Sequence, residues 1–275
     1  MKRGIKILML GAILLGLALP CHAEKIVLAG STTVLPIAQK AAEVYMNNNP
    51  QAQISVRGGG SGVGIAAIIE GTCDIADSSR AIKPEELDKA NGNGKDVVAH
   101  VIAMDGICVI VNPSNNVKAL TKKQLRDIFT GGISDWAQVG GNAGKIVVVS
   151  RDSSSGTFEA FGELALGGQK VRSDALLQAS NQAVASTVAS TPNAIGYVGL
   201  GYLSSSVRAI TYEGVDPSKQ AVLTSKYKLG RPLFMYTNGA AKGLTKDFLD
   251  FVLGADGQKL VEEEGFVALK EIAAK

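Results

Sequence analysis

A short apolar run, a turn of small polar residues and a helix-like segment follow one another three times in this sequence. The clearest unit has the apolar run 145–149, the turn 150–157 and apolar residues at helical spacing over 158–166. The turns 30–33 and 58–62 belong to two earlier units of the same kind. Short buried strands that alternate with helices predict an α/β fold.

The turn 150–157 carries groups that can bind an anion. The first amides of a helix have no partner within the helix, and the helix dipole makes that end positive. Gly156 lets a ligand approach the backbone, Ser155 and Thr157 offer hydroxyl donors, and Arg151 offers a charged fork of donors. Ser155 as a simple helix cap and Arg151 as a surface charge would explain a single turn equally well. Because the pattern recurs, we favour a site for a tetrahedral oxyanion.

Two other segments have polar residues at the expected edge of the sheet. The predicted strand 73–76 ends in a polar run that includes Ser79 and Arg80, and open α/β sheets bind ligands just beyond the carboxyl ends of their strands. A surface ion pair explains Arg80 equally well. The glycine run 58–62 matches neither a dinucleotide fingerprint nor a P-loop.

The N-terminus has the features of a secretion signal. A basic start is followed by an apolar run over residues 7–19 and by small residues that end at Ala23. We therefore predict that residues 1–23 are a signal peptide, that cleavage follows Ala23, and that the mature protein is periplasmic. Its removal takes away three basic residues and no acid, so the formal charge falls from +3 to zero. A neutral protein argues against nucleic acid or an anionic membrane as the main partner.

The residues after Ala23 lack the usual signs of an enzyme active site. His100 is the one histidine after Ala23, which excludes a site built from several histidines, and a G-x-S-x-G elbow is missing. We expect no catalytic residue, no metal and no cofactor. Cys73 and Cys108 could form one disulfide in an oxidising compartment, or they could remain buried thiols, and both alternatives stay open.

Four segments together resemble the phosphate-binding proteins of bacterial phosphate-specific ABC transporters. They are GSTTVLPIA at 30–38, GGGSGVGI at 58–65, DIADSSR at 74–80 and SRDSSSGTF at 150–158. The resemblance implies a type II periplasmic-binding-protein fold, with two α/β lobes that each have a mostly parallel sheet flanked by helices. Two crossing strands would join the lobes as a hinge.

The resemblance and the strand pattern together predict the lobe boundaries. Lobe 1 is expected to contain residues 24–107 plus 226–275, and lobe 2 residues 108–225. The first crossing is placed near Asp105-Gly106, which we expect to separate a strand over 97–104 from one over 107–112.

The family resemblance also implies how phosphate would be held. Donors from both lobes would close on a dehydrated anion, and a monomer would deliver it to inner-membrane ABC permease subunits. The resemblance and the polar residues after the strands together give the predicted phosphate-binding set: Ser31, Thr32, Thr33, Ser61, Ser79, Arg80, Arg151, Ser155, Gly156 and Thr157.

One position departs from the family pattern. Well-known members carry an Asp after the third strand, which accepts the proton of hydrogen phosphate and repels sulfate. Ser79 stands there in this sequence. A hydroxyl can accept or donate, so we expect phosphate to remain the ligand with a different mechanism of selectivity. The alternative ligands are sulfate and molybdate, and a secreted phosphatase is the less favoured alternative function.

Overall fold

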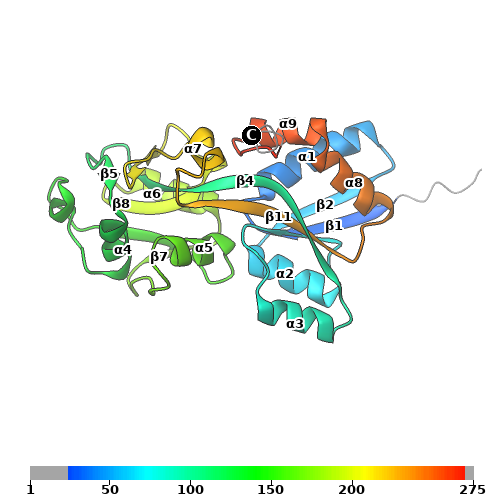
Figure 1. The fold of residues 1–275 in the computed structure, drawn as a ribbon. Coiled ribbons are helices and arrows are strands. Elements are labelled where there is room, and N and C mark those ends of the chain that lie inside the picture. The colour runs from blue at the N-terminus through cyan, green and yellow to red at the C-terminus, as the bar shows by residue number, and fades with distance from the viewer. Residues whose placement is uncertain (1–23, 270–275) are drawn as a thin grey trace, which may run out of the picture.

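Two long strands, β4 (Val97–Val111) and β11 (Gly230–Asn238), run between the two lobes of the molecule (Figure 1). The computed structural model describes residues 24–269. The predicted signal peptide and the last six residues of predicted lobe 1 lie outside the described residues.

Lobe 1 contains the first two of the three predicted strand–turn–helix units, and the third lies in lobe 2. The central strand of lobe 1 pairs in parallel with a strand on each side. Helices cover both faces of this sheet: Ile37 and Phe248 belong to the core on one face, and Ile65 and Ile68 to the core on the other. Its elements are β1 (Lys25–Gly30), α1 (Leu35–Asn48), β2 (Gln53–Gly58), α2 (Ser61–Glu70), β3 (Ile75–Ser78), α3 (Pro84–Gly92), α8 (Gly243–Leu253) and α9 (Ala255–Glu263).

Lobe 2 also has a central strand with a parallel neighbour on each side. Its middle strand β6 pairs in parallel with β7 and β8. Its elements are β5 (Ala119–Leu120), α4 (Lys122–Thr130), the 3-10 helix η1 (Trp136–Val139), β6 (Val147–Arg151), α5 (Gly156–Leu164), β7 (Leu176–Gln178), α6 (Asn181–Ser190), β8 (Ala194–Gly199), the 3-10 helix η2 (Leu200–Tyr202), β9 (Arg208–Ala209), β10 (Thr211–Tyr212) and α7 (Lys219–Leu223).

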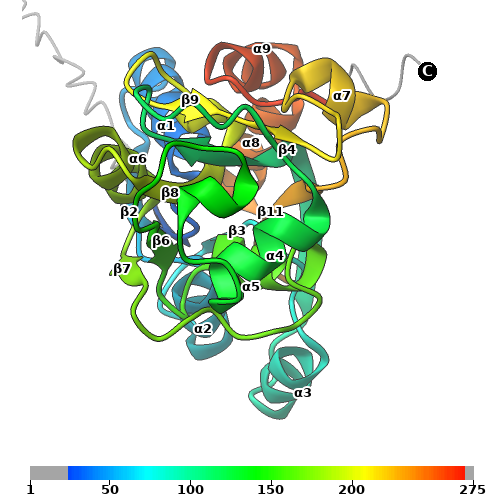
Figure 2. The ribbon, with the colours of Figure 1, turned by 90° about the vertical axis from the view of Figure 1, so that its left-hand side faces the viewer.

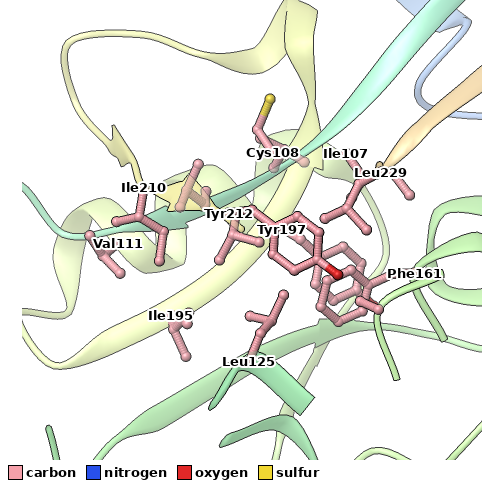
Figure 3. Close-up of a cluster of buried hydrophobic side chains, with 14 of the residues drawn as sticks. Ile107, Cys108, Val111, Leu125, Phe161, Ile195, Tyr197, Ile210, Tyr212 and Leu229 are labelled. Atoms are coloured by element: carbon pink, nitrogen blue, oxygen red, sulfur yellow. The ribbon is translucent and has the colours of Figure 1, made fainter. Parts of the chain in front are cut away.

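Successive residues of β8 show how helices cover both faces of this second sheet. A Cβ on Gly196 would lie 2.8 Å from Val184 of α6, so this face packs closely on that helix. The next residue, Tyr197, stacks on Phe161 of α5 with ring centroids 4.0 Å apart (Figure 3). Figure 2 views the molecule from lobe 2, with α4 and α5 on one side and α6 on the other.

The hinge strands join the two parallel sheets by antiparallel pairing. β4 pairs with β11 from Val97 to Gly106 and then with β8 from Ile107 to Val111. The strand order is β2-β1-β3-β11-β4-β8-β6-β7, with β9 also paired to β4. The predicted two-lobed α/β fold class is therefore confirmed.

The predicted break at Asp105-Gly106 is wrong, because β4 runs through both residues without interruption. Long-range partners make these turn-forming residues compatible with a strand. The Asp105 carboxylate accepts from Arg231 and from the Leu200 amide. A Cβ on Gly106 would lie 2.9 Å from Val222, so a glycine is needed for close packing there.

Candidate functional site

The polar turns of the two lobes meet across the hinge. Thr33 Oγ1 of lobe 1 lies 3.0 Å from Thr157 Oγ1 of lobe 2. A Cβ on Gly156 would lie 2.2 Å from Ser61 Oγ, so lobe 2 reaches the second turn as well. All the predicted site residues are buried: Ser31, Thr32, Thr33, Ser61, Ser79, Arg80, Arg151, Ser155, Gly156 and Thr157.

The first turn is fixed to the end of β3. The Ser31 amide donates to the Asp77 carbonyl at 2.8 Å, and Gly30 has a φ of 138°. A Cβ on Gly30 would lie 2.1 Å from the same carbonyl, so this close approach requires glycine. Ser31 Oγ accepts from the Thr33 amide at 3.1 Å. The turn thus presents Thr32 and Thr33 above the carboxyl edge of the sheet.

The second turn is tied to the polar end of β3 by two serines. The Ser79 amide donates to Ser61 Oγ at 3.0 Å, and the two Oγ atoms are 3.3 Å apart. A Cβ on Gly64 would lie 2.4 Å from the Ala29 carbonyl, so α2 packs directly on β1. This packing brings the start of α2 and the end of β3 to one place.

Arg151 is held so that one nitrogen remains available. Its Nε donates to the Gln178 carbonyl at 2.9 Å and its Nη2 to the Ala179 carbonyl at 3.0 Å. Its Nη1 is buried and has no hydrogen-bond partner. Burial lowers the pKa of the guanidinium, because low dielectric disfavours the charged form. A buried charged donor without a partner is costly, and a bound anion would satisfy it.

Ser155 is a helix cap, and it can also face a ligand. Its Oγ accepts from the Phe158 amide at 3.2 Å, as the capping interpretation expects. This bond uses the oxygen as an acceptor and leaves the hydroxyl proton free to be donated. Gly156 and Thr157 follow as the first residues of α5.

Arg80 differs from the other predicted site residues. Its Nη1 and Nη2 donate to the two carboxylate oxygens of Glu86 at 2.8 and 2.7 Å. Its Nε lies 2.9 Å from Glu159 Oε2. The planar fork of arginine matches a carboxylate in this way, so the structure places Arg80 in ion pairs instead of among the hydroxyls.

Two residues of the hinge strands enter the site although the sequence pattern does not predict them there. Arg231 Nη2 donates to Thr33 Oγ1 at 3.3 Å and to Thr157 Oγ1 at 3.0 Å. Asp105 Oδ2 accepts from the same nitrogen at 2.8 Å. Burial raises the pKa of Asp105, and Arg231 opposes this rise. An acid between two predicted apolar strands is the one local signal for this pair.

Two further residues of lobe 2 contact the first turn, although they are about 150 residues or more away from it in the sequence. Asn181 Nδ2 donates to Thr32 Oγ1 at 3.1 Å and to Thr33 Oγ1 at 3.0 Å. The Tyr202 hydroxyl donates to the Thr32 carbonyl. Neither residue lies in one of the recurrent turns, so local sequence gives no signal for them.

Residues 24–269 contain neither a cluster of metal ligands nor a helix that could cross a bilayer. Within that range, no group of three or more His, Cys, Asp or Glu could hold a metal ion. No described helix is both long enough and apolar enough to span a bilayer. Cys73 and Cys108 are buried free thiols, which decides between the two alternatives left by the sequence.

Comparison with known proteins agrees with this geometry. The family described as the PBP superfamily domain matches residues 18–256. The phosphate-binding protein PstS of Bacillus subtilis is 36% identical over 247 residues, which cover 89% of this chain and 81% of that protein. The chain belongs to the PstS family.

Solved structures in the same family share the fold. A Clostridium perfringens protein, described as a phosphate ABC transporter substrate-binding protein with bound phosphate, has a TM-score of 0.84 and 33% identity, and the match covers 90% of this chain and 100% of that one. An ABC-type phosphate transport receptor from Vibrio cholerae has a TM-score of 0.73 and 34% identity, over 88% and 99% of the two chains. The resemblance drawn from the four PstS-like segments is thus confirmed.

Proposed function

We propose that this protein captures inorganic phosphate between its lobes and delivers it to the membrane subunits of an ABC importer. The observation that carries the proposal is the buried Nη1 of Arg151, a charged donor without a partner at the end of β6. The hydroxyls of Thr33 and Thr157, which lie 3.0 Å apart across the lobes, add further donors. A tetrahedral oxyanion suits such a set of donors. The names of the PstS relatives support phosphate as that anion.

The proposed binding groups come from both sides of the cleft, and Arg80 is left out because its nitrogens face carboxylates. Ser31 contributes by fixing the first turn. We propose the predicted boundaries for the lobes, with residues 24–107 plus 226–275 in one and 108–225 in the other. The remaining groups are Thr32, Thr33, Ser61 and Ser79 from lobe 1, and Arg151, Ser155, Gly156 and Thr157 from lobe 2.

Phosphate would enter while the lobes are apart. In the structure the lobes meet directly, since Thr33 and Thr157 touch and the Ser154 hydroxyl donates to the Gly59 carbonyl at 2.9 Å. Closure around an anion would replace the contact between the two threonine hydroxyls by bonds to phosphate oxygens. Strands β4 and β11 are the connections about which such a movement would turn.

We propose binding without turnover. A serine nucleophile needs a base, and both oxygens of Asp105 already accept hydrogen bonds. His100 Nε2 lies 3.0 Å from Thr237 Oγ1 instead of contacting a serine of the turns. We further propose that the protein acts as a periplasmic monomer after cleavage at Ala23.

The test is a calorimetric titration of phosphate into ligand-free protein, with Arg151→Ala and Thr32→Val beside the wild type. We expect one phosphate per wild-type molecule and strongly weakened binding in both variants. Undiminished binding in both folded variants would contradict the proposed site. A chromogenic phosphatase assay on the same wild-type sample should show no turnover, and measurable hydrolysis would favour the enzyme alternative.

A further inference from the structure

Arg231 lies where the two lobes and the hinge meet. Its side chain is 4% exposed and comes from β11, a hinge strand. Nη2 reaches Thr33 of lobe 1 and Thr157 of lobe 2, and Nη1 donates to the Ser79 carbonyl at 3.2 Å. One guanidinium therefore contacts turns from both lobes at the point where their hydroxyls meet.

Asp105, on the neighbouring hinge strand, holds Arg231 in place. Arg231 and Asp105 lie opposite each other in the β11–β4 ladder. Asp105 Oδ2 accepts from Arg231 Nε at 3.0 Å and from Nη2 at 2.8 Å. The carboxylate thus fixes the guanidinium through the hinge strands themselves, and we expect this arrangement to persist when the lobes part.

The charges around the cleft do not balance. Arg231 is close enough to Arg151 to help lower the pKa of that guanidinium. Asp105 is bonded to Arg231 and to the Leu200 amide, and no carboxylate forms an ion pair with Arg151 in the described chain. Asp152 raises the pKa of Arg151 from a distance, but its Oδ1 accepts from the Ser154 amide and hydroxyl. Of the two guanidinium groups, that of Arg231 is paired directly with an acid and that of Arg151 is not.

We propose that Arg231 is a second anion-binding arginine, which donates through Nη2 to the bound anion while Asp105 holds its Nε. This inference rests on the proposed function, because it requires the anion to sit in the cleft. The anion would take the place of Thr33 and Thr157 as acceptor for the Nη2 proton that does not face Asp105. Two guanidinium groups favour a tetrahedral anion with two negative charges over one with a single charge.

The test compares phosphate binding by the full exported protein with that of Arg231→Gln. Because loss of Arg231 leaves Asp105 buried and unpaired, a second variant carries Asp105→Asn together with Arg231→Gln. This double variant removes both charges, so the net charge of the pair is zero before and after the change. The matched control is Arg208→Gln, since Arg208 in lobe 2 donates to the Asn115 and Val117 carbonyls.

Calorimetry with inorganic phosphate should show affinity about 10- to 100-fold weaker in both Arg231 variants, as expected for the loss of one charge-assisted bond. The Arg208 variant should bind as the wild type does. A folded double variant that binds phosphate within about threefold of the wild type would overturn the inference and leave Arg231 as a hinge contact. If the wild type itself binds no phosphate, the proposed function fails first.

Discussion

Glu159 Oε2, on α5 of lobe 2, lies 2.9 Å from Nε of Arg80 in lobe 1. Lys83 Nζ contacts the same oxygen at 2.8 Å, and Glu86 holds Arg80 from its other edge. One carboxylate of lobe 2 thus meets two cations of lobe 1. We infer that this ion-pair cluster stabilises the closed arrangement of the lobes without contacting the ligand.

Glu159→Gln should therefore speed the release of phosphate. The Glu159 side chain is 22% exposed, so we expect a modest effect, with a dissociation rate about three- to tenfold higher. Stopped-flow displacement of bound phosphate measures this rate. Glu163→Gln, an exposed change on the same helix, is the control. Equal release rates in the two variants would show that the cluster does not hold the lobes together.

Ser79→Asp should sharpen the discrimination between phosphate and sulfate. Ser79 Oγ lies beside Ser61 and would be 3.0 Å from a Cβ on Gly156, so a carboxylate there would face the anion. It can accept a proton from hydrogen phosphate but repels sulfate, which has none to donate. We expect the ratio of phosphate to sulfate affinity to rise at least about tenfold. The neutral Ser79→Asn variant is the control, and an equal rise in that variant would contradict the charge argument.

Asp77→Asn should stabilise the protein near neutral pH. The Asp77 carboxylate is buried without a hydrogen-bond partner, and burial raises its pKa well above the usual range. The folded state then keeps a proton that the unfolded state releases, so the free energy of unfolding falls as pH rises above the ordinary aspartate pKa. Asparagine carries no titrating proton at this position, so the free energy of unfolding of the variant does not fall in this way.

Denaturant unfolding at two pH values measures the effect of Asp77→Asn. We expect the variant to gain about 1 kcal/mol or more over the wild type near neutral pH. In acid, below the ordinary aspartate pKa, both forms carry a neutral side chain and the difference should shrink. A gain of the same size at both pH values would show that titration of Asp77 is not its source.

Cys73 and Cys108 should resist thiol reagents in the folded protein. Burial raises the pKa of Cys73 to about 12 and that of Cys108 well above its ordinary value, so thiolate is scarce. A colorimetric thiol assay should give almost no reaction before denaturation and both thiols of the mature chain after it. Absence of reaction after denaturation without reductant would instead indicate a disulfide.

Local sequence signals predicted most elements of this fold. Pro36 falls in the first turn of α1, Gly71 ends α2 in the left-handed region, and Thr121 with Gln124 forms a capping box at the start of α4. Each of these signals involves residues within one or two turns of the chain, so the sequence alone is enough to recognise it. The recurrent turns were found for the same reason.

The parts that sequence did not predict depend on distant partners. Arg231 and Asp105 are 126 residues apart, and only the antiparallel ladder brings them together. Asn181 reaches Thr32 across the interface of the lobes. The position of Arg80 after β3 predicts a ligand contact, but its partner Glu159 comes from lobe 2. A turn pattern shows which groups face a sheet edge, but not which of them already have a partner.

The most direct test is a crystal structure of the protein, unfolded to remove ligand, refolded and crystallised with phosphate. The account predicts one tetrahedral anion between the lobes, within hydrogen-bond distance of Arg151 Nη1 and of the hydroxyls at the starts of α1 and α5. A phosphate bound elsewhere, or a closed cleft with Arg151 Nη1 still unpartnered at saturating phosphate, would contradict it.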